Sequence, residues 1–282
     1  MSGEEIKNVV RNAFDEVSDG YDCPALRFFD NSAVLLTKRL SLSGNERVLD
    51  VATGTGKIAL ALANRLNHGF VTGVDISSGM LSVAQRKASD AQVKNIAFVK
   101  SDIDALDFPP AHFDGVTCGF GVHFWPSMEQ SLARLLGLVK ANGFVAFTSF
   151  ANGSFEPTAS QCLQQFSRYG VQLPATYSIE RLDHPDKNRR LFEAVGLKQV
   201  HSFQDQVGYY LPNAEAWWDL VRFTGYRAFL NQLNAAQIPQ FKAEFLRTIS
   251  PADGNREIFL NVDVITTIGV ATASTGLAGH FH

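Results

Sequence analysis

Cysteine, excess positive charge and long apolar runs are scarce in this chain, and each shortage excludes a class of protein. The 282 residues include only Cys23, Cys118 and Cys162, which are too few and too scattered for a disulfide framework or a zinc cluster. The net charge of −3 shows no basic excess, so no nucleic-acid partner is indicated. The most apolar stretch, 265–279, is shorter than the roughly 20 residues of a membrane span. We expect no metal site, no membrane span and, since nothing resembles a signal peptide, a cytoplasmic protein.

Phenylalanine, by contrast, is plentiful, with 22 residues against 3 methionines in a chain that is 45% hydrophobic. Such a surplus of aromatic side chains indicates a large apolar interior or an aromatic-lined pocket. The length suits one large α/β domain with insertions, or a domain with a cap. The oligomeric state is left open.

Strand and helix patterns alternate through the middle of the chain. Apolar runs at 47–52, 69–76, 95–103, 113–122 and 143–150 alternate with helical patterns at 56–66, 77–91 and 127–139. Strands about 20–30 residues apart with helices between them imply a parallel sheet with right-handed crossovers.

The alternation of strand and helix patterns ends after residue 150. There we predict one long strand over 198–211, one helix over 213–233 and a final strand over 258–273. The helical patterns between the last two strands indicate an insertion into the sheet.

The stretch VLDVATGTGKIAL, residues 48–60, has two glycines at the turn between a predicted strand and a predicted helix. Gly54 and Gly56 let a ligand approach the main chain, and strand, glycine-rich turn and helix form a nucleotide-binding geometry. Taken alone, the pattern also fits a dehydrogenase or a merely structural turn.

Three predicted strands each end in an acid, at Asp50, Asp75 and Asp102. Asp50 would repel a pyrophosphate and suits a ligand that carries an ammonium group. Asp75 can accept hydrogen bonds from both ribose hydroxyls, as in nicotinamide-dependent enzymes, and Asp102 can accept one from an adenine amino group. The carboxyl ends of parallel strands share one edge of a sheet, so the three acids should lie along it.

Over residues 45–150, the glycine stretch, the strand-end acids and the FDGV of residues 113–116 jointly resemble the class I S-adenosylmethionine-dependent methyltransferases. The FDEVSDGYD of residues 14–22 is similar to the segment that folds over the cofactor in the ubiquinone and menaquinone biosynthesis type. The resemblance implies a Rossmann-like, seven-stranded, mostly parallel sheet with helices on both faces. It also implies a helical lid (1–40), a cofactor-binding core (41–150), and remaining strands with a substrate-binding helical insertion (151–282).

The resemblance also implies the contacts with S-adenosyl-L-methionine. The methionine and ribose portions would lie on Ala52, Thr53, Gly54 and Gly56, and Asp50 would orient the amino group directly or through water or the main chain. Asp75 would bind the ribose, while the adenine would be enclosed by Ile76, Met80, Asp102 and Ile103. Gly119 and Phe120 would offer main-chain carbonyls to the methionine amine, and Tyr21 would reach the carboxylate or close over the site. Many relatives carry a polar side chain where this chain has Gly119, so that contact is in doubt.

The methyl acceptor is a small molecule, and the aromatic residues of the insertion suggest that it is apolar or aromatic. Trp217, Arg222 and Tyr226 are candidates to contact it, although each also suits a packed or surface position. His123 follows the fourth strand and is a candidate general base, with a main-chain cap as the alternative. Whether oxygen, nitrogen or carbon is methylated stays open. The alternative functions are a nicotinamide-dependent oxidoreductase and a non-catalytic member of the same fold.

Overall fold

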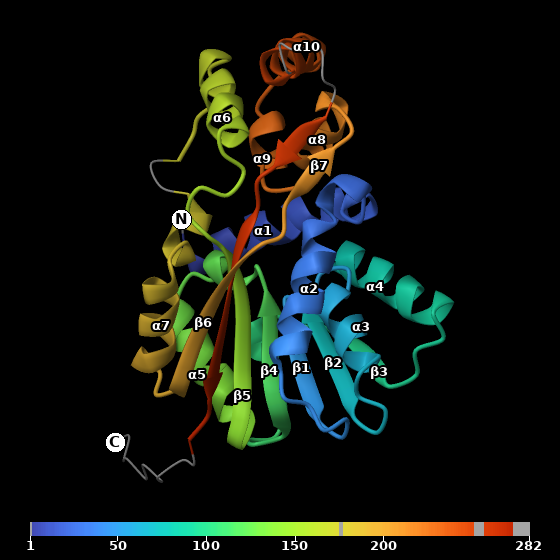
Figure 1. Cartoon of the computed structure of the whole chain (residues 1–282), viewed down its shortest axis with the longest axis vertical. Coiled ribbons are helices and arrows are strands. Elements are labelled where there is room, and N and C mark those ends of the chain that lie inside the picture. Colours follow the sequence, from blue (N-terminus) through green and yellow to red (C-terminus); the bar gives the residue numbers. More distant parts are fainter. Residues whose placement is uncertain (1, 175–176, 251–256, 273–282) are drawn as a thin grey trace.

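A seven-stranded sheet forms the lower half of the computed structural model, which describes residues 2–174, 177–250 and 257–272 (Figure 1). Its order is β3-β2-β1-β4-β5-β9-β6. The strands are β1 (Arg47–Val51), β2 (Phe70–Asp75), β3 (Ile96–Lys100), β4 (Phe113–Gly119), β5 (Val139–Phe150), β6 (Lys198–Gln206) and β9 (Asp263–Val270). Because only β9 runs antiparallel to its neighbours β5 and β6, the predicted mostly parallel sheet is confirmed.

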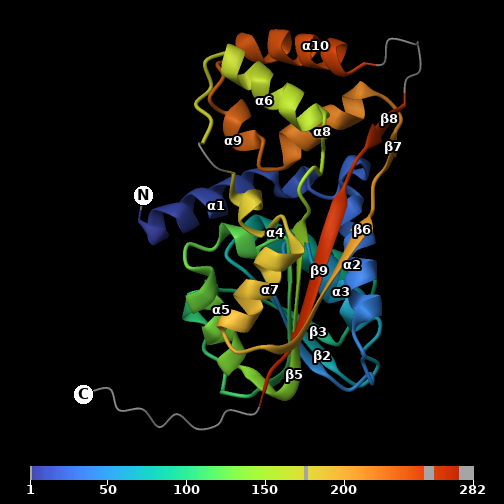
Figure 2. The same cartoon turned by 60° about the vertical axis from the view of Figure 1, so that its left-hand side comes forward.

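Helices cover both faces of this sheet. Helices α2 (Phe28–Arg39) and α3 (Lys57–Ala63) lie on one face, and α5 (Met128–Gly137) and α7 (Pro185–Ala194) lie on the other (Figure 2). Helix α4 (Ser78–Asp90) packs against β2 and β3. The central strands are apolar on both faces, as buried parallel strands are: Val48, Leu49 and Val51 have no exposed surface.

A second layer, which we call the cap, sits beyond the carboxyl edge of the sheet (Figures 1 and 2). It contains α6 (Thr158–Arg168), α8 (Ala214–Phe223), α9 (Arg227–Leu230), α10 (Gln237–Ile249) and the two-stranded ribbon of β7 (Tyr209–Leu211) and β8 (Ile258–Leu260). The cap confirms the predicted helical insertion.

Three predicted elements are wrong in detail. The strand over 198–211 divides into β6 and β7 at Gly208, where a Cβ atom would lie 2.1 Å from the Leu260 carbonyl oxygen. The final strand likewise divides into β8 and β9, and its predicted end at residue 273 lies outside the described residues. The helix over 213–233 divides into α8 and α9 because Thr224 is extended, with φ −126° and ψ −167°.

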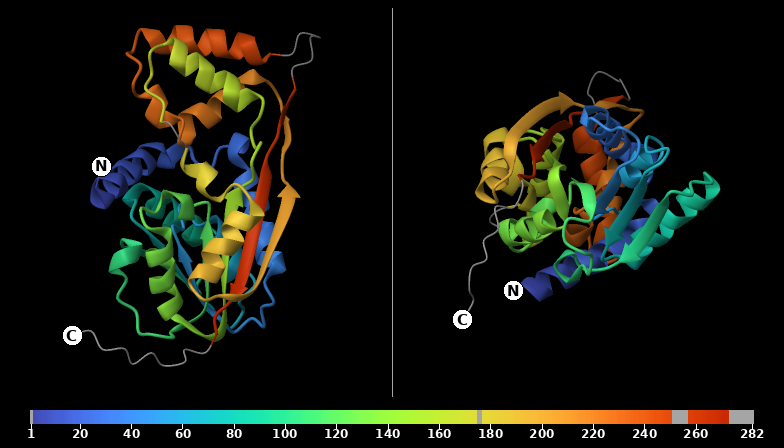
Figure 3. Two further views of the ribbon diagram at one scale, coloured as in Figure 1. Left: turned by 90° about the vertical axis from the view of Figure 1, so that its left-hand side faces the viewer. Right: turned by 90° about the horizontal axis from the view of Figure 1, so that it is seen from below.

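The lid comprises α1 (Gly3–Val17) and the 3-10 turns η1 (Ser18–Gly20) and η2 (Pro24–Leu26). Helix α1 crosses the carboxyl edge of the sheet between core and cap (Figure 3). Gly20 lies directly beneath Phe223 of the cap, since a Cβ atom there would be 2.0 Å from the ring. The predicted lid therefore contacts both layers, whereas α2 packs on the sheet face beside α3. No helix in the described ranges has the length and apolarity to cross a membrane.

Candidate cofactor-binding site

A small pocket opens at the carboxyl ends of β1 and β4, beneath the lid. It is lined by Tyr21, Phe29, Asp50, Ala52, Thr53, Gly54, Thr55, Lys57, Ile58, Gly119 and Phe120. Seven of the residues predicted to bind cofactor are in this set. The free volume is about 60 Å³, whereas pockets that hold a ligand of drug size have roughly 300–1,000 Å³. The pocket is therefore too small for the whole cofactor, and side chains that line it must move when the cofactor binds.

The two glycines of the turn have different surroundings. A Cβ atom on Gly54, at φ +55°, would meet nothing within 4 Å, so its α-carbon faces open space in the pocket. A Cβ atom on Gly56 would lie 3.1 Å from Ala84 Cβ and 3.3 Å from Phe98 Cζ. Gly54 thus leaves room for a ligand against the main chain, and Gly56 allows the start of α3 to pack closely on Ala84 and Phe98.

Asp75 joins this turn to the end of β2. Its Oδ2 atom accepts a hydrogen bond from the Gly54 main-chain N–H at 2.8 Å, and Oδ1 accepts one from Ser77 N–H at 2.9 Å. Burial raises the pKa of Asp75, against the effect of these bonds. These bonds hold the carboxylate rigidly, and each oxygen keeps a lone pair for another donor. Asp75 is not among the residues that line the small pocket, so its contact with the ribose hydroxyls stays a prediction.

Asp50 lies deeper, at 1% exposure. Thr53 and Thr117 donate their hydroxyls to its two carboxylate oxygens at 2.6 and 2.7 Å. Burial raises the pKa of Asp50 to about 6, although both hydroxyls oppose the shift. Each oxygen accepts one hydroxyl and keeps one lone pair, so the role of Asp50, to orient the amino group directly or through water or the main chain, stays a prediction.

Two non-glycine residues at this edge adopt positive φ angles, Ala52 at +50° and Phe120 at +57°. Such strained conformations cluster at functional sites. The neighbouring Gly119 has a packing cause, because a Cβ atom there would lie 2.6 Å from Ile58 Cδ1. A side chain at this position would therefore require the Ile58 side chain to shift.

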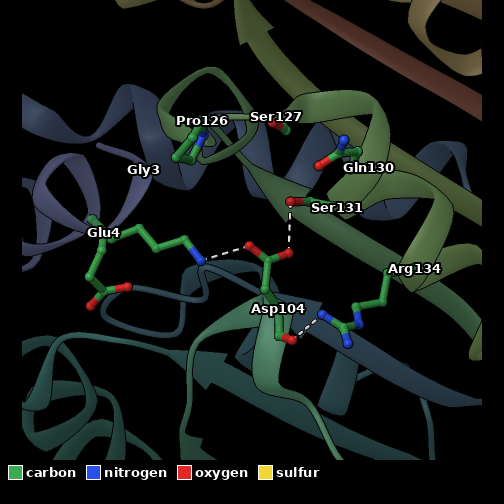
Figure 4. A pocket seen from close by; sticks show the side chains of 9 residues that line it. Gly3, Glu4, Asp104, Pro126, Ser127, Gln130, Ser131 and Arg134 are labelled. Atoms are coloured by element: carbon green, nitrogen blue, oxygen red, sulfur yellow. Dashed lines mark hydrogen bonds and ion pairs between the residues drawn. The ribbon is translucent and has the colours of Figure 1, made fainter. Parts of the chain in front are cut away.

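Asp102 at the end of β3 already has strong partners. Its Oδ2 atom lies 2.7 Å from the Lys7 ammonium of α1, and its Oδ1 accepts the Asp104 N–H at 2.9 Å. Lys7 also reaches Asp104, which accepts the Ser131 hydroxyl, in a more open hollow between α1 and α5 (Figure 4). An adenine amino group would have to share Asp102 with this lysine.

The other predicted adenine contacts belong to the interior of the protein. Ile103 is 8% and Met80 only 1% exposed, and Ile76 is partly buried. None of the three, nor Asp102, lines the small pocket. Their contact with adenine stays a prediction.

The lid reaches the loops that follow three neighbouring strands. Lys7 binds the loop after β3, and Asp15 accepts hydrogen bonds from Ser77 Oγ at 2.7 Å and Gly79 N–H at 2.9 Å in the loop after β2. Asp22 accepts the Thr55 hydroxyl at 2.8 Å after β1. The lid is thus attached beyond β1, β2 and β3, at three of the four strand ends that carry predicted cofactor residues; Gly119 and Phe120 lie at the fourth, the end of β4.

Tyr21 places an aromatic ring of this lid in the pocket. Its ring stacks on Phe29, with the centroids 5.1 Å apart. Burial raises the pKa of Tyr21, and the carboxylates of Asp22 and Asp75 add to the shift. The phenol therefore stays protonated and can donate a hydrogen bond.

The candidate base His123 lies in the short turn η4 (Val122–Phe124) and is 3% exposed. Burial, followed by the nearby Arg181 charge, lowers the pKa of His123 to about 3. Arg181 Nη1 also donates to the His123 carbonyl oxygen at 3.0 Å. The imidazole is neutral near pH 7 but intrinsically a weak base, so its catalytic role stays a prediction.

The three predicted acceptor contacts lie in the cap. Trp217 is 1% exposed and packs against Phe245 and Tyr226, with centroids 5.4 and 6.0 Å away. Arg222 pairs with Asp219 at 3.5 Å and is about half exposed. None of these candidates lines the cofactor pocket, and the packing of Trp217 explains that residue without a ligand.

Several residues of the site were missed by sequence reasoning. Thr117 pairs with Asp50 through the register of β4 against β1, which no local pattern encodes. Phe29 carries no motif. Lys57 directly follows the glycine turn, and Asp15 and Asp22 lie in the FDEVSDGYD segment, so their positions gave a usable signal.

The sheet, the glycine turn and the buried acid at the end of β2 define a Rossmann-like fold of the kind that binds adenosine-containing cofactors. A family model described as a methyltransferase domain matches residues 48–143. Aklanonic acid methyltransferase DauC of Streptomyces sp. (strain C5) is 32% identical over 158 residues, 55% of this chain and 72% of that protein. Demethylmenaquinone methyltransferase of Symbiobacterium thermophilum is 28% identical over 222 residues, 71% of this chain and 88% of the relative.

Solved structures agree on the fold. The YcgJ protein of Bacillus subtilis has a TM-score of 0.56 at 20% identity, covering 86% of this chain and 100% of its own. Phosphoethanolamine N-methyltransferase 2 of Haemonchus contortus, solved with S-adenosylhomocysteine, has a TM-score of 0.57 at 15% identity, covering 93% and 60%. The chain belongs to the class I S-adenosylmethionine-dependent methyltransferases of small molecules, and S-adenosylmethionine is its cofactor. The comparisons do not support the oxidoreductase alternative.

Proposed function

We propose that this methyltransferase acts on a planar aromatic or otherwise apolar small molecule, which it binds between the lid, the sheet edge and the cap. The carrying observation is a continuous chain of stacked and edge-on ring contacts, the aromatic wall, formed by Tyr21, Phe28, Phe29, Phe120, Phe150 and Phe155. Tyr21, Phe29 and Phe120 line the cofactor pocket. Phe28, Phe120 and Phe150 are at most 8% exposed, whereas Tyr21 and Phe29 are only partly buried. Since aromatic rings pair at centroid distances of about 4.5–7 Å, the Tyr21 and Phe29 end of this wall suits a flat acceptor beside the cofactor.

The ring geometry supports this assignment. Phe29 meets Phe120 edge-on at 5.1 Å, and Phe120 stacks on Phe150 at 4.4 Å with an interplanar angle of 28°. Phe150 continues to Phe155 at 5.0 Å. The wall therefore runs from the cofactor pocket toward the cap. The names of two relatives, for aklanonic acid and for demethylmenaquinone, a quinone, agree with such an acceptor.

For the cofactor, we propose that its methionine and ribose portions lie against the main chain at Gly54 and that Asp75 accepts the ribose hydroxyls. The negative charge of Asp50 would attract the ammonium group, and Tyr21 would close over the pocket. The adenine would lie toward Ile103 and the end of β3. When bound, S-adenosylmethionine supplies an electrophilic methyl group on a sulfonium sulfur.

The chain contributes orientation and exclusion of water more than proton transfer. The titratable residues among those described along the pocket are Tyr21, Asp50 and Lys57. Tyr21 keeps its proton, Asp50 is bonded to two hydroxyls and Lys57 is ion-paired. We therefore propose an acceptor whose nucleophilic atom needs alignment alone, with donor and acceptor about 3–3.5 Å apart. The three cysteines are free, which suits the reducing cytoplasm that we propose as its location.

Matched acceptors test this function. Planar aromatic acceptors should be methylated, and aliphatic compounds of similar size and polarity should not. Phe120→Leu should raise KM for the acceptor, whereas Phe259→Leu, on the exposed ribbon at 45% exposure, should not. Preferential methylation of a hydrophilic aliphatic acceptor would contradict the proposal.

A further inference from the structure

Lys57 is the cationic side chain among the described residues that line the cofactor pocket. Its side chain is only 10% exposed. The Asp50 carboxylate lines the same pocket. One buried cation and one buried anion in a single pocket match a zwitterion, which is the charge pattern of the amino-acid end of the cofactor.

Two carboxylates hold Lys57 in the present structure. Both oxygens of Asp30 contact the ammonium, at 2.9 and 2.8 Å, and Asp22 Oδ1 lies 2.8 Å away. Asp22 also accepts the Thr55 hydroxyl at 2.8 Å and pairs with Lys87 at 2.7 Å. The side chain of Asp30 is 54% exposed, so water can replace its lysine partner.

We propose that Lys57 binds the α-carboxylate of the cofactor and exchanges Asp30 for it when the cofactor enters. This rests on the proposed placement of the cofactor. The exchange costs little, because the Asp30 side chain is 54% exposed and water solvates its carboxylate once it leaves Lys57, and because Asp22 keeps its bonds to Thr55 and Lys87. The new pair is worth more, since charge-assisted hydrogen bonds strengthen where water is excluded.

The exchange also connects the cofactor to the lid. Asp22 directly follows Tyr21 in the lid, and it shares Lys57 with Asp30 of α2. A bound carboxylate on Lys57 leaves Asp22 attached to α4 through Lys87. The lid therefore stays attached to α4 when the cofactor occupies the pocket.

Two ligands separate a carboxylate contact from a structural role. S-adenosylhomocysteine carries the amino-acid group, whereas 5′-methylthioadenosine retains adenosine and sulfur without it. Lys57→Gln should weaken S-adenosylhomocysteine binding roughly tenfold or more and leave 5′-methylthioadenosine binding within about twofold. Isothermal titration calorimetry measures both, and Lys57→Arg, which keeps the charge, should retain most of the affinity.

Two variants serve as controls for the ion pairs themselves. Asp30→Asn removes the displaced carboxylate, and Lys87→Gln removes the other lysine on Asp22. Both should leave S-adenosylhomocysteine affinity unchanged, or for Asp30→Asn slightly tighter. The proposal is overturned if Lys57→Gln weakens both ligands equally, or if either control reproduces its effect. Failure of the parent protein to bind either ligand would instead contradict the cofactor site itself.

Discussion

Replacing Asp75 with asparagine tests the ribose site most sharply, because the structure defines what the side chain holds before a ligand arrives. Each carboxylate oxygen accepts one main-chain N–H, from Gly54 or Ser77, and has one lone pair left. Asparagine keeps one acceptor and turns an NH₂ group toward the other N–H. Two charge-assisted bonds to ribose hydroxyls, at about 1.5–3 kcal/mol each, would be weakened or lost.

The loss of one such bond lowers cofactor affinity roughly tenfold, and the loss of both roughly a hundredfold or more. Calorimetric titration of the Asp75→Asn variant with S-adenosylhomocysteine measures this, with a thermal melt to confirm folding. Asp107→Asn, an exposed carboxylate in a loop, is the control and should bind like the parent. A dissociation constant within about twofold of the parent in folded Asp75→Asn would refute the assignment.

Three further predictions concern pH, the glycine turn and the lid. Because burial raises the pKa of Asp50 to about 6, its contribution to stability is present below about pH 4 and is lost as pH rises to about 6. Asp50→Asn should therefore raise Tm at neutral pH by a few degrees. In the parent protein, cofactor affinity should fall below about pH 6, where Asp50 protonates. An unchanged Tm and an affinity that does not vary with pH would contradict this. Gly54→Val should abolish cofactor binding, because its side chain would fill the open space of the pocket. Gly56→Ala should instead lower Tm, because its Cβ atom would lie 3.1 Å from Ala84 Cβ. Loss of stability in the first variant and loss of binding in the second would contradict these roles. S-adenosylhomocysteine should slow hydrogen exchange over residues 10–25, and protection confined to 50–120 would show that the lid is only a packed helix.

The sheet was predictable because its signals are local. Buried parallel strands read as apolar runs, and the glycine turn and strand-end acids mark the carboxyl edge along the chain. The lid was predictable only by resemblance, from the segment that contains Asp15 and Asp22.

What failed depends on contacts between distant parts of the chain. The predicted strand over 198–211 divides because β6 pairs with β9 whereas β7 pairs with β8, and Thr117 reaches Asp50 only through the register of β4 against β1. The sequence left both a ligand contact and a packed position open for Trp217, and its packing against Phe245 and Tyr226 in the cap came only from the tertiary structure. Sequence patterns indicate which face of an element is apolar, whereas tertiary packing decides whether that face meets a ligand or another helix.

The most direct test of the whole account is transfer of a labelled methyl group from S-adenosylmethionine to a component of a metabolite extract, followed by mass spectrometry of the labelled product. We predict a product heavier by one methyl group on a planar aromatic or apolar small molecule, and much less of it with Asp75→Asn. Cofactor binding without a labelled product from any extract fraction, or label confined to protein or nucleic acid, would contradict the account.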